Sequence, residues 1–177
     1  MKLTYQDLLE KMTNMEMLAI PPEKGEMGGN FSSYDRNSSY DPSTDTYSQW
    51  GANRDCDGYI RMEKDRLVAF EMEGPGVIWR IWSANPQEGH IRIYTENEQK
   101  EKMDMPFRKL FERYAYDESR VEWPANFPEL MPILSRGRNR FIPIPFNNYC
   151  KVTLDPGWGE FYHITYTKFP SCVELPE

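Results

Sequence analysis

The sequence predicts an all-β fold, a single jelly-roll-type sandwich preceded by a short N-terminal helix. From residue 59 onward, eight short strand-like segments follow one another, each bounded by Gly, Pro, Asn or Asp. The 14 prolines and 11 glycines favour many turns over a helical bundle. The segment 74–82, Gly-Pro-Gly-Val-Ile-Trp-Arg-Ile-Trp, is typical of a buried strand, and we expect the domain to be organised around it.

An N-terminal helical arm is expected over residues 1–22. Thr4 can cap a helix over 4–17, Asp7 takes the capping-box position, and Leu8 and Met12 follow at helical spacing. The two prolines at 21 and 22 end any helix there. We expect this arm to pack on the domain or on a neighbouring subunit.

The jelly-roll domain is expected to span 23–177, with long loops at 23–58 and 115–139. Loops of this length inside a domain are usually functional or disordered. The first loop carries too many aromatic residues for a solvated linker. A short helix is expected at 106–114, and the eight strands are expected at 59–62, 67–71, 77–83, 90–94, 102–105, 140–144, 151–154 and 161–166.

Strand alternation divides the central segment into two faces. With a period of two, Val77, Trp79 and Ile81 make the better core stripe unless a bulge intervenes. Arg80 and Trp82 then lie on the other face, which could border a cleft or a subunit contact. Equally, that face could form a second core between two jelly rolls or two subunits.

Composition excludes several classes of protein. The net charge of −7 and the lack of a lysine- or arginine-rich run argue against nucleic acid as a partner. No stretch approaches the roughly 20 apolar residues of a membrane span, and the N-terminus lacks signal-peptide features, so we expect a cytoplasmic protein. Three widely spaced cysteines are typical of reduced thiols. We expect no cofactor and no metal, because the zinc and nucleotide motifs are absent.

Two polar groups in the first loop could bind a sugar. Asp35 and Arg36 could fix sugar hydroxyls, or they could pair with other residues and lock the loop. Trp50 and Asn53 combine an aromatic face with a hydrogen-bonding group, as sugar sites commonly do. Asp57, with Asp55, could instead take part in a calcium site, but Asp57-Gly58 is more plainly a turn.

A late strand adds His163, which lies between two tyrosines and is either a core residue or a ligand. The candidate substrate-binding residues are Tyr34, Asp35, Arg36, Trp50, Asn53, Asp57, Trp82 and His163. No serine nucleophile elbow is present. No pair of carboxylates can be assigned from the sequence as a catalytic dyad.

A collinear series of short motifs over about residues 31–170 resembles the N-terminal half of glycoside hydrolase family 172. It runs through Phe-Ser-Ser-Tyr-Asp-Arg at 31–36, Trp-Gly-Ala-Asn at 50–53, the segment 74–82, Arg-Ile-Tyr at 92–94, Ile-Pro-Ile-Pro-Phe at 142–146 and Phe-Tyr-His-Ile-Thr-Tyr at 161–166. The resemblance implies a tandem double jelly roll that trimerises. It also implies retaining chemistry on α-D-fructofuranosyl or α-D-arabinofuranosyl bonds, with two glutamates in the second jelly roll.

This sequence departs from that family in two respects. It ends after the first jelly roll, so no catalytic residue is carried over and the catalytic residues stay unknown. The turn after the Arg-Ile-Tyr strand is Thr-Glu-Asn-Glu at 95–98 rather than the family's Asp-Gly.

The resemblance supports one main hypothesis, in which the chain is the N-terminal jelly roll of a retaining glycoside hydrolase for fructofuranosides or arabinofuranosides. Its partners would be a furanoside-containing oligosaccharide, further copies in a trimer-based homo-oligomer, and a second chain supplying the other jelly roll. The alternative is a non-catalytic module for carbohydrate binding or oligomer assembly. The chain could also be a fragment of a longer gene product.

Overall fold

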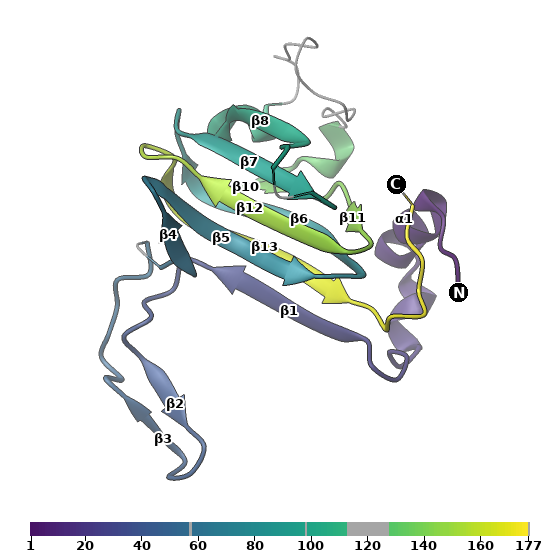
Figure 1. Ribbon diagram of the computed structural model, residues 1–177, viewed down its shortest axis with the longest axis horizontal. Helices are drawn as coiled ribbons and strands as arrows, with labels where there is room; N and C mark the ends of the chain where they lie inside the picture. Colours follow the sequence, from purple (N-terminus) through teal and green to yellow (C-terminus); the bar gives the residue numbers. More distant parts are fainter. Residues whose placement is uncertain (57, 98, 113–127, 177) are drawn as a thin grey trace.

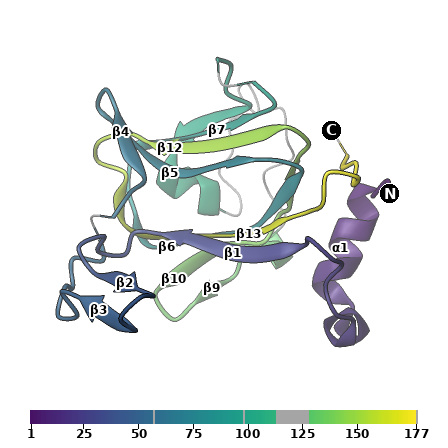
Figure 2. The ribbon, with the colours of Figure 1, turned by 60° about the horizontal axis from the view of Figure 1, so that its bottom comes forward.

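Two antiparallel sheets stack face to face in this computed structural model, which describes residues 1–56, 58–97, 99–112 and 128–176 (Figures 1 and 2). The first sheet contains, in spatial order, β1 (Met27–Ser32), β13 (Gly159–Lys168), β6 (Gly76–Pro86), β10 (Gly137–Arg140) and β9 (Ile133–Leu134), with β11 (Ile144–Phe146) also paired to β6. The second contains β4 (Arg61–Glu63), β5 (Arg66–Glu73), β12 (Tyr149–Leu154), β7 (His90–Thr95) and β8 (Met103–Pro106).

The connections between these strands are those of a jelly roll. Without the short edge strands β4 and β9, the neighbour orders are β1-β13-β6-β10 and β5-β12-β7-β8. The chain therefore crosses between the sheets as two interlocked Greek keys, and most of these strands pair with neighbours distant in sequence, β7 with β8 being the exception. This arrangement confirms the all-β, jelly-roll-type sandwich predicted from the sequence.

The main core lies between the two sheets and is built around aromatic rings. Phe70 of β5 is fully buried, and its ring packs edge-on against Phe31, Phe146 and Tyr166 at centroid distances of 5.0, 6.2 and 5.6 Å. Aliphatic side chains from both sheets fill the remaining space, among them Ile78, Ile81, Ile91, Ile93 and Val152.

A β-bulge in the pairing of β6 with β13 corrects the predicted alternation of the central strand. Thr165 pairs with Arg80 and Tyr166 with Ile78, so Trp79 is left without a partner. Ile78 and Ile81 consequently both belong to the main core. The prediction of one core stripe made of Val77, Trp79 and Ile81 is therefore wrong.

Val77 and Trp79 instead belong to a second, smaller core beside the N-terminal helix. Val77 is fully buried with Leu8 of that helix and with Phe169, Val173 and Leu175 near the C-terminus. Trp79 packs against this cluster and donates from Nε1 to Thr167 Oγ1 at 2.9 Å. Both chain ends meet here (Figure 1).

The helix α1 (Tyr5–Thr13) begins as predicted but ends earlier. Thr4 and Asp7 form the capping box. Asn14 leaves helical geometry, with φ −86° and ψ 106°, and its side chain accepts from Glu16 N to start the 3₁₀ helix η1 (Met15–Ala19). The expected helix over 4–17 is therefore two elements. The division into an arm (1–22) and a domain (23–177) stays a prediction.

The segment 23–58, expected as a loop, contains β1 and a separate hairpin made of β2 (Ser39–Asp41) and β3 (Thr46–Ser48). The sequence Met-Gly-Gly-Asn-Phe-Ser of β1 has weak strand propensity. It pairs with β13 along its whole length, and a Cβ on Gly29 would stand 2.5 Å from the Tyr166 hydroxyl. The missing side chain therefore leaves room for a core tyrosine.

Two further predictions change in the second half of the chain. The strand expected over 140–144 is interrupted, since β10 ends at Arg140 and β11 begins at Ile144, and Pro143 between them has no N–H for a sheet ladder. The helix expected over 106–114 is the 3₁₀ helix η2 (Phe107–Phe111). Of the loop expected at 115–139, residues 115–127 lie outside the described residues, and the rest contains η4 (Pro128–Leu130), β9 and β10.

Candidate functional site

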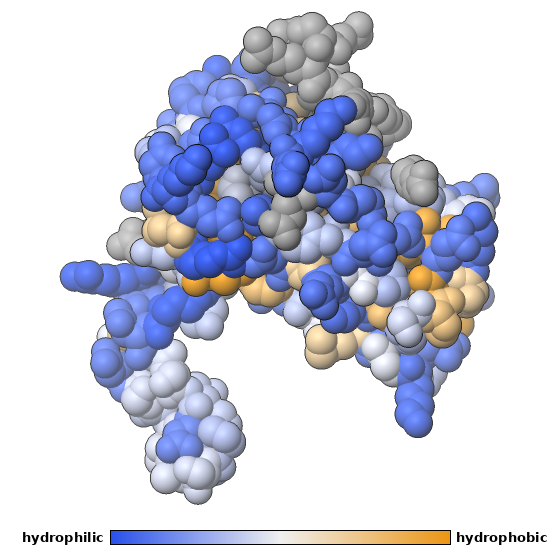
Figure 3. Space-filling view, viewed as in Figure 1, coloured by the Kyte–Doolittle hydropathy of each residue, from blue (hydrophilic) through white to orange (hydrophobic). Residues whose placement is uncertain are grey.

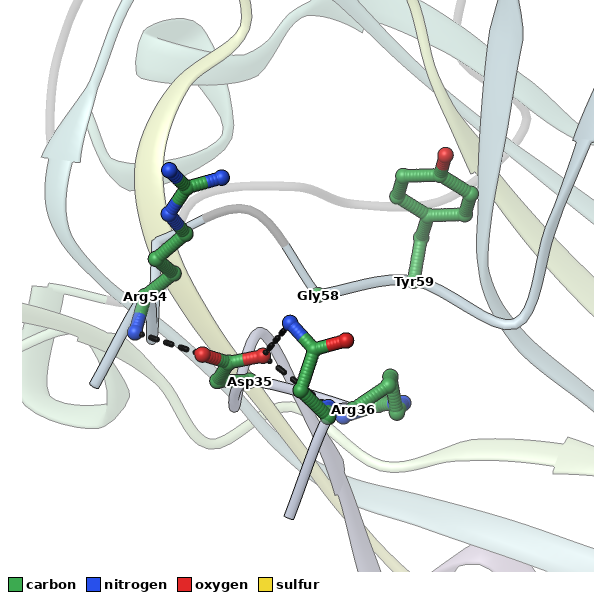
Figure 4. A pocket seen from close by; sticks show the side chains of 6 residues that line it. Asp35, Arg36, Arg54, Gly58 and Tyr59 are labelled. Carbon is green, nitrogen blue, oxygen red and sulfur yellow. Dashed lines mark hydrogen bonds between the residues drawn. The ribbon is translucent and has the colours of Figure 1, made fainter. Parts of the chain in front are cut away.

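A pocket of about 350 Å³ opens where β1 ends and the chain returns from the hairpin toward β4. Its lining consists of Asp35, Arg36, Asn37, Arg54, Gly58 and Tyr59. The side chains of Arg54 and Tyr59 rise on either side of Gly58, with Asp35 and Arg36 below (Figure 4). Two loops nearly twenty residues apart in sequence therefore form one site.

Asp35 ties these two loops together. One carboxylate oxygen accepts from Asn37 N and Asn37 Nδ2 at 3.0 and 2.8 Å, and the other accepts from Arg54 N at 3.0 Å. The backbone N–H of Asn37 is the main cause that lowers the pKa of Asp35, and the contacts to Arg54 and the Asn37 amide add to it. The carboxylate is thus ionised at neutral pH and already holds three donors.

Arg36 binds backbone rather than Asp35. Its guanidinium donates to Tyr34 O at 2.9 Å and to Ser32 O at 2.8 Å, and its Cζ lies 3.5 Å from the centre of the Tyr34 ring. These contacts fix the loop to the end of β1. The loop-locking interpretation of Asp35 and Arg36 is therefore the one that the contacts support, and both residues also line the pocket.

Buried groups at the end of the sandwich support this loop. Gly58 N donates to Ser33 O at 3.1 Å, and Gly58 O accepts from the Tyr162 hydroxyl at 3.1 Å. A Cβ at position 58 would lie 1.8 Å from Tyr34 O, so only glycine fits. Burial raises the pKa of Tyr162 to about 12, which keeps its hydroxyl protonated as a donor.

The groups that remain open to a ligand come from residues that the sequence did not single out. Within the described part of the chain, the guanidinium of Arg54 makes no hydrogen bond, and Tyr59 is 40% exposed. Arg54 directly follows Asn53, and Tyr59 was assigned to a strand. The one signal in the sequence for these pocket residues was the position of Arg54 next to Asn53 in the expected polar cluster. The pocket itself depends on the path of the chain from the hairpin back toward β4.

A second polar cluster lies on the outer face of the first sheet. The rings of Trp82 and His163 meet edge-on with centroids 5.0 Å apart, and Asn30 Nδ2 lies 3.0 Å from His163 Nδ1. Arg80 donates from Nε to Asn139 Oδ1 at 2.9 Å. Arg80 and Trp82 share this face because they lie two residues apart on β6, where the pairing with β13 is regular.

His163 is electrically neutral in this cluster. Burial lowers its pKa, and the nearby Arg80 lowers it further. The amide nitrogen of Asn30 can only donate, so Nδ1 of the imidazole accepts and the proton lies on Nε2. His163 is thus half-buried and hydrogen-bonded on the sheet surface, outside both hydrophobic cores.

The structure separates the predicted site residues into groups. Tyr34, Asp35 and Arg36 lie together at the pocket, and Trp82 and His163 lie together on the sheet. Trp50 is 78% exposed and contacts Tyr47 of the hairpin, while Asn53 is exposed beside Arg54. Asp57 lies outside the described residues.

Two carboxylates near strand ends, Glu71 and Asp155, are engaged in ion pairs. Glu71 binds Arg61 and accepts from the Tyr149 hydroxyl at 2.6 Å, and the contact with Arg61 is the main cause that lowers its pKa. Asp155 pairs with Arg92. A glycosidase general acid needs the opposite perturbation, a raised pKa. Glu71 is therefore unsuited to that role.

The described ranges contain no group of three or more His, Cys, Asp or Glu side chains arranged to hold a metal ion. They also contain no helix long and apolar enough to cross a membrane.

Comparison with known families confirms the resemblance seen in the motifs. The family model described as "GH172 first beta-sandwich domain" matches residues 24–177. No curated protein matches the chain. The matched range includes both sheets, the pocket and the outer-face cluster, and leaves out α1.

Proposed function

Because the chain belongs to glycoside hydrolase family 172, as its first β-sandwich domain, we propose that it is the sugar-binding half of a retaining glycosidase. The substrates would be fructofuranosides or arabinofuranosides. The pocket around Asp35 would hold a furanose ring, and the catalytic glutamates would come from the second sandwich. The cytoplasmic location expected from the sequence stays a prediction.

The observation that carries this proposal is the make-up of the pocket lining. The guanidinium of Arg54, the amide of Asn37 and the hydroxyl of Tyr59 offer donors and acceptors of the kind that pair with sugar hydroxyls. Asp35 and Arg36 hold the supporting loops through backbone contacts, so the site is largely preformed. A preformed hydrogen-bonding site discriminates strongly, since an analogue that lacks a hydroxyl leaves polar groups unpaired.

The same pocket argues against catalysis by this chain alone. A retaining glycosidase uses two carboxyl groups about 5–5.5 Å apart, one as nucleophile and one as acid/base. Among the six lining residues, Asp35 is the single carboxylate, and both of its oxygens accept backbone N–H groups. We therefore assign substrate positioning, and not bond cleavage, to the six lining residues.

Hydrolysis assays on aryl furanosides test whether this chain positions the substrate while the second sandwich supplies the catalytic residues. The chain alone should release no aryl alcohol, and addition of a separately expressed second sandwich should produce turnover. Arg54→Met should then raise KM. Turnover by the chain alone would contradict the assignment, as would a lack of turnover in both arrangements.

A second candidate, a module for oligomer assembly, rests on a different observation. At the edge of the first sheet, β9 exposes Ile133 and Leu134 by 54% and 63%. Exposed apolar side chains on an edge strand favour a protein contact, and a trimer of this chain is the partner we propose. Sedimentation of the chain and of Leu134→Glu tests this proposal. A monomer in both cases would contradict assembly into a trimer.

A further inference from the structure

The hairpin β2–β3 stands away from the body of the sandwich (Figures 1 and 2). In the space-filling view it projects as a separate lobe of intermediate hydropathy (Figure 3). Hydrogen bonds within the hairpin hold its two strands together. Ser39 Oγ and Ser48 Oγ are 2.8 Å apart across the strands, and the Tyr40 hydroxyl donates to Asp45 at 2.8 Å.

Three aromatic rings run along this hairpin. Tyr40 and Tyr47 are cross-strand partners with centroids 5.0 Å apart, and Trp50 follows, with its ring 5.3 Å from that of Tyr47. Their exposed fractions are 49%, 54% and 78%. These rings contact one another and remain largely exposed to solvent, so they are not part of a hydrophobic core.

The aromatic row lies close to the pocket along the chain. Trp50 precedes Arg54 by four residues, and four residues can span at most about 14 Å. Arg54 itself lines the pocket. A ligand that fills the pocket and extends toward the hairpin over this distance can therefore reach the indole ring.

The chemistry around the rings favours an uncharged, hydroxyl-rich ligand. Residues 37–53 contain two carboxylates, Asp41 and Asp45, and no lysine or arginine. An anionic ligand would find no counter-charge there. Aromatic rings offer flat apolar faces, and tyrosine hydroxyls add polar edges, which together match the apolar and hydroxylated sides of a sugar ring.

We propose that Tyr40, Tyr47 and Trp50 form a stacking track that extends the sugar site, so that the chain binds furanoside oligosaccharides more tightly as they lengthen. The pocket holds the terminal residue and the track holds the units that follow. This inference rests on the proposed sugar-binding function of the pocket, and it adds a preference for chain length.

Calorimetric titration with arabinofuranose disaccharide and hexasaccharide tests the track. The unmodified chain should bind the hexasaccharide about tenfold more tightly than the disaccharide. Trp50→Ala and Tyr47→Ala should each remove most of this gain and leave disaccharide affinity unchanged. Trp50→Phe should keep most of the gain, because it keeps an aromatic face.

Met15→Ala is the matched control, since Met15 is 76% exposed on η1, at the opposite end of the molecule from the hairpin. It should change neither affinity. The thermal midpoint should be unaltered in all four variants, because the rings lie outside both hydrophobic cores.

The possible failures are distinct. Absence of binding to either sugar overturns the proposed function, and the track with it. Equal affinity for the two sugars, or an unchanged gain in Trp50→Ala, overturns the track alone. Sedimentation of Trp50→Ala provides a further check: a lower mass with unchanged sugar affinity would assign the rings to a protein contact instead.

Discussion

Asp35 shows how one side chain can shape the pocket without reacting. Its two oxygens hold backbone N–H groups of residues 37 and 54, which belong to different loops. An ionised carboxylate serves this purpose better than a neutral group, because charge-assisted hydrogen bonds are stronger. These hydrogen bonds favour the ionised form of Asp35 and so lower its pKa.

Substitution of Asp35 should therefore weaken sugar binding through the loops. Asp35→Ala leaves both N–H groups without their acceptor, and we expect affinity for a furanose disaccharide to fall about tenfold or more. Asp35→Asn should fall less, because its amide keeps one oxygen acceptor. Titration calorimetry measures both, and equal affinity in all three proteins would show that the carboxylate does not shape the site.

His163 should make stability depend on pH. Its pKa in the folded chain is lower than the unfolded value of about 6.5, so the unfolded chain binds the proton more readily. The contribution of neutral His163 is fully present above about pH 6.5 and is lost as pH falls toward the lowered pKa.

Urea unfolding at pH 7 and at pH 5 measures this effect. The free energy of unfolding should decrease between the two values, and His163→Gln should decrease less. An identical decrease in both proteins would mean that His163 carries its ordinary pKa.

At the level of elements, the bulge in β6 decides which residues the two cores receive. The sequence correctly indicated a buried strand at 74–82, because apolar and aromatic residues dominate it. It could not indicate the bulge, which depends on the register between Thr165 and Tyr166 of a strand over eighty residues away. Strict alternation consequently assigned Trp79, and not Ile78, to the same core stripe as Ile81.

Ile78→Ala distinguishes the bulged strand from a regular one. With Ile78 in the main core, its truncation should cost about 2–5 kcal/mol, as for other buried large-to-small changes. Met27→Ala, at an exposed position of the same sheet, should change stability by less than about 0.5 kcal/mol. Denaturant unfolding gives both numbers, and a small effect at Ile78 would place it outside the core.

The first long loop shows a different limit of prediction. Its aromatic content argued against a solvated linker, and the segment contains β1 and the hairpin β2–β3. Asp35 and Arg36 lie at the pocket. β1 escaped prediction because two glycines weaken its pattern, and its strand conformation comes from pairing with β13. Arg54 and Tyr59 escaped for a related reason, since the loops that bring them to Asp35 are fixed by the Gly58 contacts with Ser33 and Tyr162.

For the whole molecule, the jelly roll provides the frame, and the proposed function depends on the pocket and the hairpin at one end of it. The double core, with α1 and the C-terminal segment closing one end, leaves the opposite end free for the pocket and the hairpin. Membership of family 172 makes the chain a glycoside hydrolase module, and we propose that this end binds the sugar. The account therefore predicts a chain that binds furanosides by itself and cleaves them only with a second sandwich.

Calorimetric titration of the chain alone with an arabinofuranose or fructofuranose disaccharide tests this claim most directly, with Arg54→Met beside it. Arg136→Met, at an exposed turn outside the pocket lining, is the control. We predict saturable binding by the chain and by Arg136→Met, and a loss of about tenfold or more in Arg54→Met. Absence of binding by the unmodified chain, or full affinity in Arg54→Met, would contradict the assignment of this pocket.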